Sequence, residues 1–72
     1  MLIQSQNQRI IVNSHTMVCM YLNEEECSIR CITTNSDDDF GYVMASYNSK
    51  EEAQNAINTF RDNINETSCY KF

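Results

Sequence analysis

The chain has 72 residues, a formal net charge of −5, and 42% hydrophobic and 10% aromatic residues. This length allows one domain, residues 1–72, and is too short for a dinucleotide-binding fold or a barrel enzyme with its own substrate cleft. The excess of acidic residues disfavours direct binding to nucleic acid and to anionic membranes, since both depend on Lys and Arg. Neither an apolar run of roughly 18 residues nor a secretion signal is found, so we expect a soluble, cytoplasmic protein.

Residues 1–47 are predicted to form short β-strands. Apolar or β-branched runs at 1–4, 9–13, 17–22, 27–34 and 40–47 are separated by turns rich in Asn, Asp, Ser and Glu. The run at 17–22 is apolar at every position, which predicts a central strand covered on both faces or a strand that meets a partner.

In two of these runs successive residues are assigned to opposite faces, and the first run is typical of a half-buried strand. The first has Cys27, Ile29 and Cys31 on one face, with Ser28 and Arg30 on the other. In the second, the predicted faces are Phe40, Tyr42 and Met44, and Val43, Ala45 and Tyr47.

The period changes after residue 47, and a helix is predicted over about 50–65. Ser49 and Glu52 fit a capping box, in which the Ser49 hydroxyl accepts the Glu52 N–H and Glu52 reaches back to the Ser49 N–H. An apolar stripe at helical spacing follows, formed by Ala53, Ala56, Ile57, Phe60 and Ile64. For the tail, 66–72, the sequence allows two alternatives: an extra edge strand, or a segment that docks on a neighbour.

Together these elements predict an α+β fold. We expect an antiparallel meander of four to five short strands, with the C-terminal amphipathic helix packed on one face. The other face is then polar or pairs with a second copy, and the apolar run at 17–22 favours a homodimer. The predicted oligomer interface consists of Met17, Cys19, Tyr21 and Tyr42.

Several segments resemble a group of small uncharacterised proteins of Gram-positive bacteria and their prophages. The matching segments are MLIQSQ at 1–6, RIIVN at 9–13, GYVMASY at 41–47, and Ser49 with EEA at 51–53. The resemblance covers residues 1–64 and departs from the group in the looser spacing from Gly41 to Tyr47, in the cysteines and in the tail. It implies a bacterial or phage setting in the host cytoplasm, but no established activity and no functional residue.

The histidine and cysteines raise the question of a zinc site. His15, Cys19, Cys27 and Cys31 could supply four ligands. However, Cys27 and Cys31 lie on one predicted strand, where residues four apart stand roughly 13 Å from each other at about 3.3 Å per residue. We therefore predict no metal and no cofactor, with the cysteines, Cys69 among them, acting as small hydrophobic residues. A small zinc-binding module remains an alternative.

Catalysis is not expected either. His15 and Cys19 lie too far apart along a strand to form a Cys–His pair, and the acidic turns are open to water, which leaves their carboxylates unsuited to acid–base chemistry. There is no glycine-rich phosphate loop.

The acidic residues gather in two turns. Six of the ten lie in these turns, as Glu24, Glu25, Glu26, Asp37, Asp38 and Asp39. In a meander the turns fall at opposite ends of the sheet, about 26 Å apart, and helix residues Glu51, Glu52, Asp62 and Glu66 extend the negative surface. The alternative interpretation of each cluster is that its charges guard strand ends against aggregation.

The sequence thus predicts a non-enzymatic protein-binding module of a mobile element. Its extended acidic surface could occupy the basic nucleic-acid channel of a host defence or nucleic-acid-handling protein, as anti-CRISPR proteins do. The six turn carboxylates are the predicted contact residues. The alternative is a structural or accessory phage protein that acts through its homo-oligomer interface.

Overall fold

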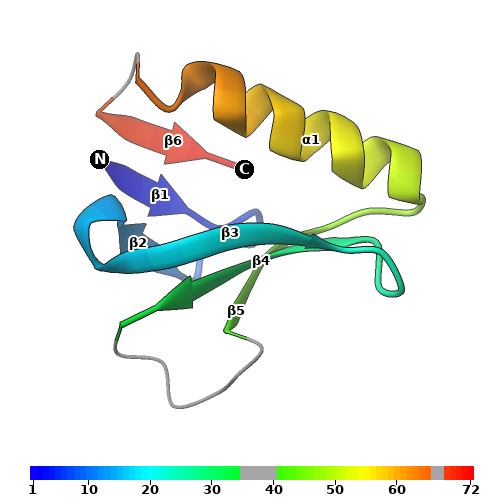
Figure 1. Ribbon diagram of the computed structural model, residues 1–72, viewed down its shortest axis with the longest axis horizontal. Coiled ribbons are helices and arrows are strands. Elements are labelled where there is room, and N and C mark those ends of the chain that lie inside the picture. Colours follow the sequence, from blue (N-terminus) through cyan, green and yellow to red (C-terminus); the bar gives the residue numbers. More distant parts are fainter. Residues whose placement is uncertain (35–40, 66–67) are drawn as a thin grey trace.

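The computed structural model describes residues 1–34, 41–65 and 68–72. In this part of the chain the fold is α+β, as predicted, with two three-stranded sheets and one helix (Figure 1). The first sheet has the order β2-β1-β6, with strands Leu2–Gln4 (β1), Ile11–Asn13 (β2) and Cys69–Lys71 (β6). The second has the order β3-β4-β5, with strands Met17–Asn23, Ser28–Thr33 and Tyr42–Ser46. The prediction of a single sheet of four to five strands is not matched.

The chain leaves the first sheet at the short 3-10 helix Ser14–Thr16, which separates β2 from β3. Asn13 stabilises this turn twice: its Oδ1 accepts from the His15 N–H at 3.0 Å, and its carbonyl accepts from Thr16 Oγ1 at 2.9 Å. Such local bonds compete with strand pairing. Consequently β3 pairs with β4 and not with β2, and the meander is divided into two sheets.

The tail forms the strand β6, one of the two outcomes that the sequence left open. It pairs in parallel with β1, so that the two ends of the chain lie side by side (Figure 1). Phe60 of the helix holds it there, with ring centroids 5.0 Å from Tyr70 and 5.5 Å from Phe72.

The helix α1, Lys50–Asn63, begins and ends close to the predicted limits. The Ser49 hydroxyl accepts from the Glu52 N–H at 3.2 Å, as expected of the cap. The reciprocal bond differs, because Glu52 Oε2 accepts from the N–H of Asn48 at 3.3 Å and not from that of Ser49.

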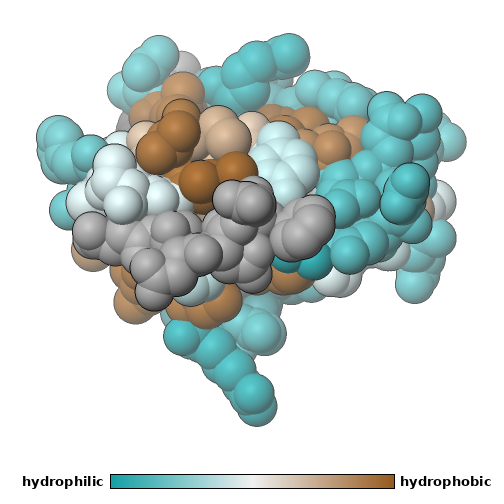
Figure 2. Space-filling model, turned by 60° about the horizontal axis from the view of Figure 1, so that its bottom comes forward, coloured by the Kyte–Doolittle hydropathy of each residue, from teal (hydrophilic) through white to brown (hydrophobic). Residues whose placement is uncertain are grey.

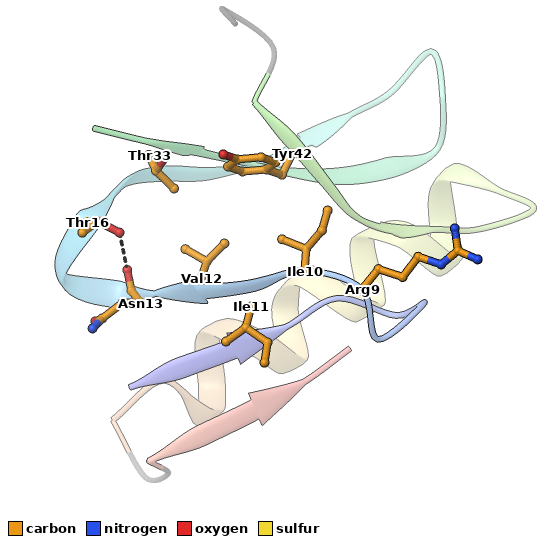
Figure 3. Close-up of a pocket in the computed structure, with 8 residues that line it drawn as sticks. All are labelled: Arg9, Ile10, Ile11, Val12, Asn13, Thr16, Thr33 and Tyr42. Carbon is orange, nitrogen blue, oxygen red and sulfur yellow. Dashed lines mark hydrogen bonds between the residues drawn. The ribbon is translucent and has the colours of Figure 1, made fainter. Parts of the chain in front are cut away.

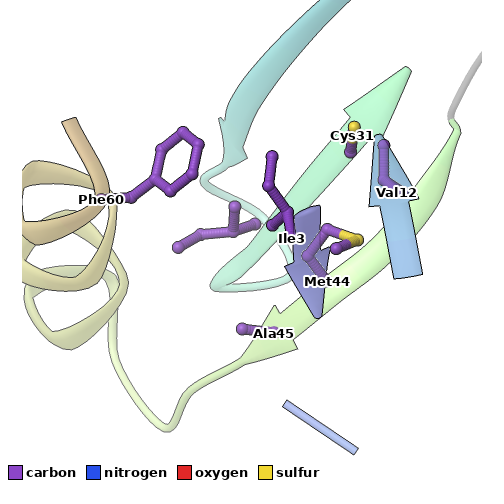
Figure 4. Close-up of a cluster of buried hydrophobic side chains, with 7 residues drawn as sticks. Ile3, Val12, Cys31, Met44, Ala45 and Phe60 are labelled. Carbon is purple, nitrogen blue, oxygen red and sulfur yellow. The ribbon is translucent and has the colours of Figure 1, made fainter. Parts of the chain in front are cut away.

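One hydrophobic core joins both sheets to the helix (Figure 4). Its buried side chains come from β1, β2, β4, β5 and α1: Ile3, Val12, Ile29, Cys31, Met44, Ala45 and Phe60. Met44 and Ala45 are neighbours in sequence and both are buried, contrary to the predicted alternation. The reason is a register shift: Ile29 pairs with Ala45 and Arg30 with Val43, so Met44 is an extra residue that turns inward.

The prediction for residues 17–22 as a central strand is wrong. The strand that contains them, β3, lies at the edge of its sheet, and none of its residues is fully buried. The most exposed, Val18, sits where the register shifts between Met17 and Cys19. The other reading of this apolar run, that it meets a partner, is compatible with an edge position.

Candidate functional site

The turn between β3 and β4 carries Glu24, Glu25 and Glu26, all exposed. Asn23 shapes the turn, because its Oδ1 accepts from the N–H groups of Glu25, at 3.1 Å, and Glu26, at 3.2 Å. Cys27 closes it with a φ of +53°, a left-handed conformation that is unfavourable for a residue with a side chain.

This turn lies against the start of α1. The Lys50 ammonium is 3.4 Å from the Glu24 carboxylate, and the N–H of Tyr47 donates to the carbonyl of Cys27 at 2.9 Å. Because Glu51 and Glu52 follow Lys50 directly, five carboxylates share one end of the molecule, where Lys50 and Arg30 form ion pairs with two of them. We call Glu24, Glu25, Glu26, Glu51 and Glu52 the acidic end.

The carboxylates of the acidic end differ in how strongly they are engaged. Glu26 Oε2 accepts from Arg30 Nη2 at 2.8 Å, from Arg30 Nε at 3.1 Å and from the Ser28 hydroxyl at 3.2 Å. The hydrogen bonds from Arg30 chiefly lower the pKa of Glu26, and the Ser28 bond adds to them. Ser28 itself is buried, although the alternation placed it on the outer face.

The remaining carboxylates are more available to a partner. Among the residues that the structure describes, the Glu24 carboxylate has one ion pair, the exposed contact with Lys50, and such surface pairs contribute little. Within the described residues, Glu25 and Glu51 form no ion pair. In this part of the chain, Glu25 and Glu51 are therefore carboxylates of the acidic end without a counter-charge in contact.

The sequence did not show that the β3–β4 turn and the helix start come together. From the sequence, the helix carboxylates are expected only to extend a long negative surface. Nothing in the residue spacing indicates the contact between Glu24 and Lys50. The second predicted acidic cluster, Asp37, Asp38 and Asp39, lies outside the described residues, as does Glu66.

The four predicted oligomer residues do not share one surface. Cys19 and Tyr21 pair with Ile32 and Arg30, and so lie on the outer face of the second sheet. Met17 packs instead against the core, and Tyr42 lines a separate groove.

That groove lies between β2 and the second sheet and has a volume of about 350 Å³ (Figure 3). Ile10 and Val12 point into it toward Tyr42, whereas Ile11 points away and is 63% exposed. Figure 2 shows that apolar side chains interrupt the polar surface on one face of the molecule.

The proposed zinc ligands are also dispersed. Cys31 is buried in the core, and Cys19 lies on the opposite face of the sheet, since the partner of Cys31 is Met20. Cys27 lies in the acidic turn and His15 in the 3-10 helix at the other end of β3. No group of three or more His, Cys, Asp or Glu that could hold a metal occurs among the described residues.

Burial raises the pKa of the Cys31 thiol to about 11 from an ordinary 9.0, with a smaller contribution from Cys19. The unfolded chain loses this proton at a lower pH than the folded one, so stability is retained below pH 9 and falls between about pH 9 and 11. We expect Cys31→Val to reduce this alkaline slope in urea unfolding measured from pH 8 to 11. An unchanged slope would show that Cys31 does not carry it.

Comparison with protein-family models, with curated proteins and with solved structures found no match. No helix in the described ranges is long and apolar enough to cross a membrane.

Proposed function

We propose that this protein is a non-enzymatic binding module of a bacterial mobile element, which inhibits a host nucleic-acid-handling or defence protein. It does so by placing its acidic end on a basic surface that otherwise holds nucleic acid. The mobile-element setting rests on the resemblance to prophage proteins. The inhibitory mode rests on one observation, the convergence of the β3–β4 turn and the start of α1.

This convergence supports the proposal through its electrostatics. Five carboxylates on two elements that lie in contact create a negative patch that a basic channel attracts and orients. The patch is held in place by the backbone bond between Tyr47 and Cys27, so a partner does not have to order it on binding.

Capture from a Gram-positive bacterial lysate tests this function when it is combined with matched charge variants. Glu25→Lys and Asp62→Lys each change the net charge by the same amount, but Asp62 lies near the opposite end of α1. We expect Glu25→Lys to weaken the captured complex about tenfold, and Asp62→Lys to change it little. Equal loss in both variants, or no loss in either, would refute the acidic end as the contact surface.

The exposed apolar side chains favour a second candidate, an accessory protein that works as a homo-oligomer. Val18 and Ile11 are each 63% exposed, and Leu2, Tyr42 and Val43 are exposed as well. Sedimentation equilibrium separates the two candidates: a strict monomer at high concentration would exclude the homo-oligomer. A complex that does not weaken above roughly 0.15 M salt would instead argue against the acidic end.

A further inference from the structure

A groove of about 430 Å³ between α1 and β3 holds apolar side chains that the core does not fully enclose. Met17 and Met20 of β3 form one wall, and Ile57, Phe60 and Ile64 of α1 form the other. Phe60 is buried, whereas the other four side chains stay partly exposed. A concave apolar site of roughly 300–1,000 Å³ is typical of small-molecule binding.

Two features of the sequence that the proposed function does not use meet in this groove. They are the apolar stripe of α1 and the apolar run at 17–22, and each supplies one wall. Figure 1 shows β3 and α1 running in opposite directions, and the groove lies between them. The groove is therefore elongated along the helix.

The side chains of the walls favour a flexible ligand over a planar one. Methionine and isoleucine supply four of the five apolar side chains, and methionine fits irregular shapes. The ring of Phe60 already packs against Tyr70 and Phe72, at centroid distances of 5.0 and 5.5 Å. These walls are better suited to an alkyl chain than to a stacked ring.

The helix adds a polar rim to the groove. Gln54, Asn58 and Arg61 line it, and Gln54 Nε2 donates to Asn58 Oδ1 at 3.1 Å. Among the described residues, Arg61 is the one charged residue that lines the groove. Its Nε is 3.4 Å from the Asp62 carboxylate, an exposed pair of the kind that contributes little. The Nη donors of Arg61 are thus in a position to bind a further carboxylate.

We propose that this groove binds a medium-chain fatty acid, with its carboxylate on Arg61 and its alkyl chain between β3 and α1. From Arg61 to Gln54 the helix spans about 10 Å, at about 1.5 Å per residue. This length suits about nine carbon atoms beyond the carboxylate, given C–C bonds of about 1.5 Å. Burial of the chain removes apolar surface of both walls from water, which stabilises the complex.

This site is separate from the acidic end. None of the five carboxylates of the acidic end lines the groove, and the charge at the rim of the groove is positive. The inference therefore goes beyond the proposed function, and it stands or fails by a different experiment.

Titration of the full chain with decanoate, followed by NMR of labelled Met and Ile methyl groups, tests the inference. Below the concentration at which decanoate forms micelles, we expect the signals of Met17, Met20 and Ile57 to shift and to saturate. Ile11, which is 63% exposed and lies outside this groove, should keep its signal. Unchanged groove signals, or an equal shift of Ile11, would overturn the inference, since the latter indicates detergent-like binding over the whole surface.

The role of Arg61 is tested with two ligands that share one chain length. Decanoate should bind about fivefold more tightly than decanol, because decanol lacks the charge. Arg61→Gln should remove this preference and leave the affinity for decanol unchanged. Arg9→Gln removes the same charge at an exposed position outside the groove, and should keep the preference. Equal affinities for the two ligands in the wild type, or the same loss in both variants, would overturn the assignment of the carboxylate.

A dilution series without ligand tests the other occupant, a second copy of this chain. If the groove is open for a ligand, the methyl signals of Met17 and Met20 should not depend on protein concentration. Signals that move toward their ligand-bound positions as the protein concentration rises would assign the groove to a second copy and overturn the inference.

Discussion

Phe60→Ala is expected to lower the free energy of unfolding by about 3–5 kcal/mol, the usual cost of deleting a buried phenyl ring. Phe60 is only 4% exposed and joins the core of both sheets. It also contacts Tyr70 and Phe72, which hold β6 beside β1. For a chain of this size the total stability is roughly 4–11 kcal/mol, so the variant should be close to unfolding.

Urea unfolding followed by circular dichroism measures this loss. Phe60→Leu serves as the control, since it fills most of the volume but removes the ring contacts, and we expect a loss of about 1–2 kcal/mol. Hydrogen exchange in Phe60→Leu should also show β6 amides opening before those of β4. If β6 stays as protected as β4, the aromatic contacts do not hold the tail.

Gly41→Ala is expected to cost about 3 kcal/mol, from backbone strain and overpacking together. Gly41 has a φ of +72°, which disfavours any side chain, and an added Cβ would lie 2.2 Å from the Cys31 carbonyl oxygen. The obstacle is backbone, so it cannot rotate away. Relief requires β4 or the residues before β5 to shift.

Thermal unfolding measures this loss of stability, and Ser46→Ala serves as the control variant. Ser46 is exposed on β5, and its replacement should change stability by no more than about 0.5 kcal/mol. A Gly41→Ala variant as stable as Ser46→Ala would mean that the chain near Gly41 does not approach Cys31 as described.

Local patterns predicted the individual elements well, because strands and caps depend on neighbouring residues. The cap at Ser49 and the stripe through Phe60 were sufficient to place α1. The division into two sheets was not predictable, since it depends on the bonds of Asn13 across the 3-10 helix. The register shift that turns Met44 inward was also not predicted. The pattern of apolar and polar residues along β5 does not reveal such a shift.

Of the candidate site, the acidic end, only the part formed by neighbouring residues was predictable from the sequence. Glu24, Glu25 and Glu26 were recognised as an exposed acidic turn from their composition alone. Glu51 lies near them only because the chain folds back toward the β3–β4 turn after β5, as the contact between Lys50 and Glu24 shows. Such a tertiary contact is not visible in the local sequence. The edge position of β3 was missed because an uninterrupted apolar run is more typical of a buried strand than of an edge.

If the acidic end contacts a basic partner as proposed, its charge acts over distance and governs the rate of encounter and its dependence on salt. Glu25→Lys should therefore mainly slow association of the proposed partner.

The most direct test of the central claim is displacement of nucleic acid from the captured host protein, followed by fluorescence anisotropy of a labelled oligonucleotide. We predict that the wild-type chain releases the oligonucleotide in proportion to its own binding. At the same concentration, Glu25→Lys should release much less and Asp62→Lys should match the wild type. Binding that leaves the oligonucleotide in place, or equal release by Glu25→Lys, would contradict the account.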